Sequence, residues 1–209
     1  FLHNCCLAGM VLVVSGLFTS CKKDSFISSS QALLSTSADT LKYDTVFTTT
    51  GSVTKSFKIF NNNDQKLRLS KVKLMGGAVS AYKMNVDGMA TTESSNIDIE
   101  ANDSIYVFVS VTINPNAANL PFIISDSILV QYNGNNRYIQ LQAFGQNANF
   151  LRNQVLTGNT TWNNTLPYVI LGGLQVGNGA TLTIPAGTRV YAHADAPIIV
   201  DGTLLVNGT

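Results

Sequence analysis

The alternation of apolar and polar residues between positions 40 and 143 is the feature that most constrains the fold. A period of two places successive side chains on opposite faces, as in β-strands with one buried face. Turn-forming residues separate the runs, and a break in the alternation at Ser70-Lys71 indicates a β-bulge. We expect strands over residues 41–47, 56–60, 67–74, 82–86, 97–99, 104–113, 127–132 and 138–143, the last two joined through the turn Asn133–Asn136.

Seven or eight short strands within about 105 residues are typical of an immunoglobulin-like antiparallel β-sandwich. We assign this domain to residues 39–149 of an all-β chain. Charged residues make up only 12% of the sequence, which disfavours helical bundles because these need charged exposed faces. The formal net charge is +1, and the largest basic cluster (Lys66, Arg68, Lys71 and Lys73) alternates with apolar residues as on a solvated strand. We therefore expect no nucleic-acid partner.

A repeat marks the C-terminal part of the chain. Thr181–Ile184 is echoed by Thr203–Val206 at an offset of 22 residues, and each segment is followed within three residues by Gly-Thr. A looser copy is Leu174–Val176. Short β-segments with glycine at the corners and this spacing predict the first coils of a parallel β-helix over residues 150–209. Since such folds need at least three repeats, we expect the natural protein to continue beyond Thr209.

The N-terminal segment predicts export. The apolar run Cys5–Phe18 is too short to span a bilayer but has the length of a signal-peptide core. The sequence Leu-Phe-Thr-Ser-Cys at 17–21 resembles a lipobox, which predicts cleavage before Cys21 and lipidation of its thiol. Residues 1–20 are then a lipoprotein signal peptide, N-terminally incomplete because no basic residue precedes the apolar run, and residues 21–38 are a polar tether.

This succession of features resembles a group of Bacteroidota surface lipoproteins. Besides the lipobox ending at Cys21, the resemblance rests on four segments: Asp39–Phe47, Ile99–Phe108, Ala143–Ala148 and Gly179–Thr188. It implies an outer-membrane lipoprotein, facing the periplasm or the cell surface and held to the membrane by its lipid. It implies no particular activity.

A second resemblance concerns modification. The Bacteroidota O-glycosylation motif is Asp, then Ser or Thr, then an aliphatic or small residue. It occurs four times in this chain and makes candidate acceptors of Thr40, Thr45, Ser104 and Ser127. Asp-Ser and Asp-Thr also recur at turns for local hydrogen-bonding reasons.

No catalytic or metal-binding constellation stands out, so we predict no catalytic residue, metal or cofactor. A glycosidase needs two converging carboxylates; Asp195 and Asp201 are the best pair, and corner aspartates offer a simpler explanation. His193 lacks the three or four ligand partners that zinc requires. Three aromatic residues suggest either a sugar platform or packing at the domain junction: Trp162, Tyr168 and Tyr191.

These observations favour a non-enzymatic cell-envelope lipoprotein, in which the sandwich is a spacer and the β-helix surface serves adhesion or glycan contact. One alternative is the N-terminal part of a polysaccharide lyase or glycoside hydrolase whose catalytic coils lie beyond residue 209. Another is a structural envelope subunit that docks through an exposed β-helix edge. The oligomeric state stays open.

Overall fold

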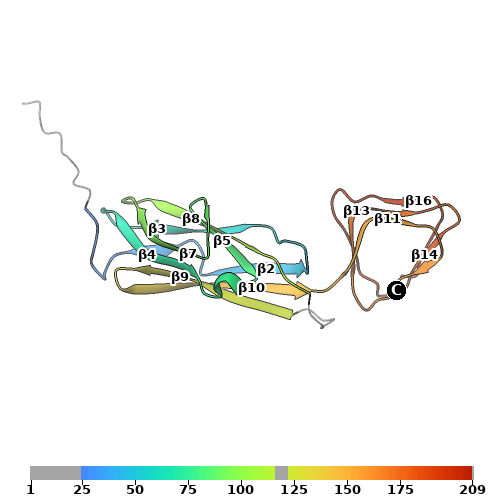
Figure 1. The fold of residues 1–209 in the computed structure, drawn as a ribbon, viewed down its shortest axis with the longest axis horizontal. Helices are drawn as coiled ribbons and strands as arrows, with labels where there is room; N and C mark the ends of the chain where they lie inside the picture. The colour runs from blue at the N-terminus through green and yellow to red at the C-terminus, as the bar shows by residue number, and fades with distance from the viewer. Residues whose placement is uncertain (1–24, 116–121, 209) are drawn as a thin grey trace, which may run out of the picture.

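The computed structural model describes residues 25–115 and 122–208, and these form an all-β protein with two units arranged end to end (Figure 1). The larger unit holds strands β1 to β10, and the smaller unit holds β11 to β17. A single 3-10 turn, η1 (Gly77–Val79), interrupts the strands of the described part. No helix in these ranges has the length and apolarity needed to cross a membrane.

The larger unit consists of two five-stranded sheets. The first has the order β1 (Leu34–Thr36), β3 (Lys55–Asn61), β8 (Ser104–Val111), β5 (Tyr82–Val86) and β6 (Met89–Ala90). The second has the order β2 (Thr40–Phe47), β10 (Asn135–Gln146), β9 (Phe122–Tyr132), β4 (Leu67–Leu74) and β7 (Glu93–Ile99). All neighbours are antiparallel except β2 and β10.

This strand order confirms the predicted immunoglobulin-like sandwich. Strands β1, β3, β8 and β5 occupy the positions A, B, E and D of that fold, and β4, β9 and β10 occupy C, F and G. Strand β2 adds an edge beside β10, and β7 adds one beside β4. The predicted bulge is present as a register shift between Leu69 and Lys71 where β4 pairs with β9.

Three elements differ from the sequence expectation. The β9–β10 hairpin turns on Asn133 and Gly134 alone, both with positive φ, and Asn135 already pairs with Tyr132. An Asn-Gly pair suits a two-residue turn, so the strands extend further than predicted. Strand β7 begins at Glu93 rather than 97, because ion pairs from Glu93 to Lys71 and Lys73 hold its polar half against β4.

The described part of the predicted tether, residues 25–38, lies against the sandwich. Strand β1 pairs with β3, the Ile27 amide donates to the Lys66 carbonyl, and Ala32 is buried. The side chain of Asn133 donates to the carbonyls of Ile27 and Ser29. The chain therefore joins the sandwich several residues earlier than its alternation suggests.

Two buried tyrosines connect the sheets through the core. The Tyr43 hydroxyl of β2 donates to the Val109 carbonyl of β8, and the Tyr82 hydroxyl of β5 donates to the Ile124 carbonyl of β9. Their rings lie 6.0 Å apart. Burial raises the pKa of Tyr43 to about 12, and burial likewise raises the pKa of Tyr82.

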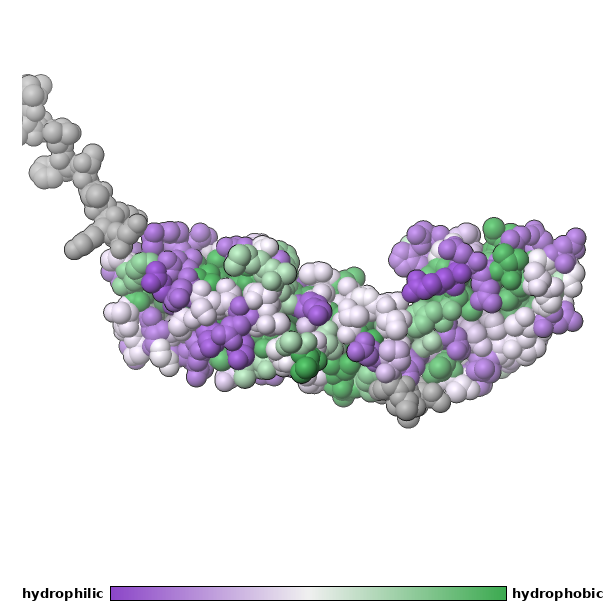
Figure 2. Space-filling model, in the orientation of Figure 1, coloured by the Kyte–Doolittle hydropathy of each residue, from purple (hydrophilic) through white to green (hydrophobic). Residues whose placement is uncertain are grey.

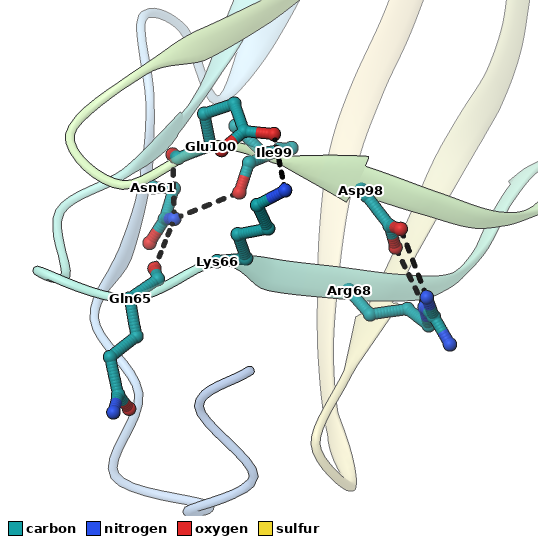
Figure 3. Close-up of polar contacts among 7 residues, drawn as sticks. All are labelled: Asn61, Gln65, Lys66, Arg68, Asp98, Ile99 and Glu100. Carbon is teal, nitrogen blue, oxygen red and sulfur yellow. Dashed lines mark hydrogen bonds and ion pairs between the residues drawn. The ribbon is translucent and has the colours of Figure 1, made fainter. Parts of the chain in front are cut away.

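A buried amide closes one end of the sandwich (Figure 3). Asn61 is 1% exposed, and its Nδ2 donates to the carbonyls of Gln65, Ile99 and Glu100 at 2.8–3.1 Å. Its Oδ1 accepts from the Asn63 backbone at 3.1 Å. One side chain therefore satisfies backbone groups of two loops that would otherwise be buried without partners.

The smaller unit is built from parallel pairs only. One sheet contains β11 (Asn149–Leu156), β13 (Tyr168–Val176), β15 (Val190–Ala192) and β16 (Ile198–Val200). The other contains β12 (Thr160–Thr161), β14 (Thr181–Ile184) and β17 (Thr203–Val206). The two repeated segments of the sequence pair directly, with Thr181 opposite Thr203, 22 residues later.

The core of this unit is closed on the side of β11 and β12 and open on the side of β16 and β17. Val176 and Leu182 are 0% and 1% exposed, whereas their ladder partners Val200 and Leu204 are 41% and 38% exposed. Figure 2 shows hydrophobic residues at the surface over β16. Apolar side chains on the last strands thus point toward a core that those strands do not cover.

Candidate functional site

The candidate site lies where the parallel ladder of the smaller unit is broken. The register between β11 and β13 shifts between Arg152 and Gln154, so Asn153 has no ladder partner and adopts a positive φ. Opposite it stand Gly172 and Gly173, with φ of 78° and 146°. These backbone conformations favour glycine, and a Cβ at position 172 would overlap the Asn153 amide.

The break creates a hollow of about 190 Å³ across three parallel strands. Its polar lining consists of the amides of Asn153, Gln154 and Gln175. Its apolar lining comes from neighbouring strands and includes Val155, Leu174, Pro197 and Ile199. An amide can donate and accept hydrogen bonds at once, which is the chemistry that matches a hydroxyl-rich ligand.

One outward row of side chains crosses the hollow. Gln175 pairs with Val155 on one side and with Ile199 on the other. Its Nε2 donates to Asp201 Oδ2 at 2.6 Å, which fixes the amide beside an exposed carboxylate. This is the place of Asp201, named from the sequence as one of two candidate acids, and the structure gives it an amide partner.

Asp195, the other candidate acid, pairs with His193 on the turn between β15 and β16. The imidazole shares a hydrogen bond with the carboxylate through Nδ1, and this bond holds the pKa of Asp195 below its ordinary value. Both side chains are more than 60% exposed. Within the described ranges, no group of three His, Cys, Asp or Glu residues could hold a metal ion.

The three aromatic residues considered as a sugar platform do not share a surface. Trp162 and Tyr168 are 5% and 8% exposed and stack on each other at 4.1 Å inside the core of the smaller unit. Tyr191 packs instead on Phe47 of the sandwich at 5.1 Å. Of the two explanations weighed from the sequence, the arrangement matches packing, with Tyr191 at the junction between the units.

The candidate O-glycosylation sites all lie on the sandwich. Thr40 and Thr45 are exposed on β2, whereas Ser104 and Ser127 are half-buried on β8 and β9. The preceding carboxylates Asp103 and Asp126 accept from the backbone of the following serine. Cys21, the predicted lipidation site, and the predicted signal peptide lie outside the described residues.

The amide-lined hollow was not anticipated from the sequence. Gly172 and Gly173 attracted attention as a glycine cluster between β-segments, and they lie within β13. The signal that was available is a glycine pair inside a strand, which often marks a bulge or a close approach of another chain segment.

No protein-family model and no curated protein matches this chain. Solved structures share part of its shape. A family 123 glycoside hydrolase from Clostridium perfringens is 14% identical over 55% of this chain, with a TM-score of 0.38. A protein of unknown function from Porphyromonas gingivalis is 10% identical over 60%, also with a TM-score of 0.38.

An MSP family member from C. elegans is 14% identical over 55% of this chain and 98% of its own length, with a TM-score of 0.34. The matched part corresponds to only 25% of the clostridial enzyme and 60% of the Porphyromonas protein. These similarities are too low to carry an argument about activity.

Proposed function

We propose that this protein is a non-enzymatic cell-envelope lipoprotein of the Bacteroidota type, anchored through Cys21. The sandwich is its spacer, and the smaller unit forms the first coils of a parallel β-helix that contacts glycans. The observation that carries the proposal is the amide-lined hollow across strands β11, β13 and β16. An outer-membrane location, facing the periplasm or the cell surface, follows from the proposed anchor.

Two properties of the smaller unit support this assignment. The offset of 22 residues recurs in both of its sheets, since Tyr168 pairs with Val190 and Thr160 pairs with Leu182. Coils that stack at a constant offset produce flat ladders along which an extended polymer can lie. The hollow interrupts one ladder with amide groups, which bind hydroxyls without supplying the paired acids of glycoside hydrolysis.

The open side of the smaller unit favours a second candidate function, that of a structural envelope subunit. Ile198, Val200 and Val206 are 41–61% exposed on strands with one unpaired edge. A strand of another protein added there would cover these side chains and complete the backbone hydrogen bonds. Analytical ultracentrifugation separates the two candidates, since a docking subunit self-associates or binds an envelope partner through this edge.

A glycan array carrying host and plant oligosaccharides tests the leading proposal with the purified protein. The proposal expects retention on a subset of glycans. Silence across the array contradicts it. The lyase or hydrolase alternative predicts instead that a retained glycan is shortened on incubation with the full-length natural protein, which chromatography of the soluble products detects.

The anchor has its own test. In a native host fed an alkyne fatty acid, the wild-type protein is expected to carry the label and to sediment with membranes. The Cys21→Ser variant is expected to lose both properties. A variant that keeps the label contradicts lipidation at Cys21.

A further inference from the structure

The outer face of the sandwich carries a pair of exposed aromatic rings that the core does not use. Tyr106 and Phe108 alternate along β8 with buried residues, so both point away from the sandwich core. They are 42% and 40% exposed, and their rings stack at 5.6 Å with planes 16° apart. The Lys58 ammonium lies 4.5 Å from the Tyr106 ring centre, which leaves Phe108 as the less engaged ring.

Phe108 forms one wall of a hollow of about 400 Å³ on this face. That volume lies within the range of small-molecule sites. Its polar lining comes from Thr54, Lys83, Asn85 and Ser110. The strand register explains the grouping, because Asn85 of β5 lies opposite Phe108, and Lys83 lies opposite Ser110.

The polar groups of the hollow are available to a ligand. No hydrogen bond or ion pair among the described residues occupies Lys83 Nζ, Thr54 Oγ1 or Ser110 Oγ. The Asn85 Oδ1 accepts from the Gly88 backbone at 2.9 Å, which holds the amide in place with Nδ2 toward other partners. The lining therefore contains two hydroxyls, one oriented amide and one cation, and it contains no carboxylate.

This combination matches one class of ligand. A pyranose ring has an apolar face of C–H groups that packs on the negative face of an aromatic ring, and a rim of hydroxyls that donate and accept. A carboxylate on the ring complements the single ammonium group. A purely apolar ligand would leave three polar groups desolvated without partners, which is costly.

We infer that the face formed by β3, β8 and β5 is a binding site for a uronic-acid unit of a glycan. Phe108 stacks on the sugar ring, Lys83 pairs with its carboxylate, and Asn85 and Ser110 bind its hydroxyls. The sandwich is then a binding module as well as a spacer. This site is separate from the hollow of the smaller unit and does not depend on the function proposed for it.

The test is isothermal titration of the purified protein with tetrasaccharides of galacturonate, mannuronate and glucuronate. At least one is expected to bind. Phe108→Ala and Lys83→Gln are expected to weaken that binding tenfold or more. Tyr138→Ala is the matched control, because Tyr138 is a 47% exposed aromatic on the other sheet. Circular dichroism checks that each variant keeps its sheet content.

Further measurements separate the parts of the inference. Methyl esterification of the bound uronate is expected to weaken binding to the wild type but not to Lys83→Gln. Gln175→Ala, in the smaller unit, is expected to leave this binding unchanged, so a failure of either site is recognised separately. The inference is overturned if no uronate tetrasaccharide binds, if Phe108→Ala binds like the wild type, or if the ester binds as well as the acid.

Discussion

Replacing Asn61 by alanine is expected to destabilise the sandwich far more than the same change one residue later. Asn61 bonds the carbonyls of Gln65, Ile99 and Glu100 and the Asn63 backbone amide. Water can reach Gln65 and Glu100, which are not buried, so the Ile99 carbonyl and the Asn63 amide bear the loss. Two buried backbone groups without partners cost about 2–4 kcal/mol together.

Asn62→Ala is the control. Asn62 is exposed, and its amide makes one bond to Ser35 Oγ at 2.8 Å, so the change is expected to cost no more than about 0.5 kcal/mol. Both variants are made in the full chain and unfolded in urea. With a slope of about 1–3 kcal/mol per molar, Asn61→Ala lowers the midpoint by roughly 1–2 M.

Two probes assign the effect to one unit. The single tryptophan, Trp162, is buried in the core of the smaller unit, so its fluorescence follows that unit. Far-ultraviolet circular dichroism follows all the strands. Asn61→Ala is expected to shift the part of the dichroism transition that fluorescence does not follow. Equal midpoints for Asn61→Ala and Asn62→Ala would refute the reasoning about buried backbone groups.

Three further predictions concern other parts of the molecule. In Gly202→Ala, the new Cβ would stand 2.3 Å from the Ala180 carbonyl oxygen, so the tryptophan transition should fall by several times the effect of Gly208→Ala, where no atom lies within 4 Å. The raised pKa of Tyr43 means that stability holds below pH 10 and is lost as the pH rises toward 12, and absorbance at 295 nm should show its ionisation only as the sandwich unfolds; early ionisation of every tyrosine would contradict this. The Arg68 guanidinium holds the pKa of Asp98 below its ordinary value, so this pair contributes above that value and loses its contribution as the pH falls; urea midpoints of Arg68→Gln and wild type should differ more at pH 7 than at pH 3, and a constant difference would argue against the pair.

Much of the sandwich was predictable because its signal is local. Alternation along 67–74 and 104–111 specifies which residues face the core, and the same alternation broke at the bulge. Strand β1 escaped prediction because three residues are too few to show a period. The polar half of β7 escaped because its partners, Lys71 and Lys73, come from another strand.

The candidate sites were less predictable, because they depend on pairing between distant residues. The hollow of the smaller unit joins Asn153 to Gly172 and Pro197, and nothing local relates these positions. The aromatic trio failed as a platform for the same reason, since Trp162 and Tyr168 face inward and Tyr191 meets Phe47. The repeat offset of 22 was readable, and it predicted which strands would lie side by side.

The claim that the smaller unit contacts glycans is tested most directly by titrating a glycan retained on the array into three proteins. The account predicts that Gln175→Ala binds about tenfold more weakly than the wild type, equivalent to about 1.4 kcal/mol. It predicts that Gln140→Ala, an exposed strand glutamine of the sandwich, binds like the wild type. Equal affinity of Gln175→Ala and wild type for every retained glycan would contradict the account.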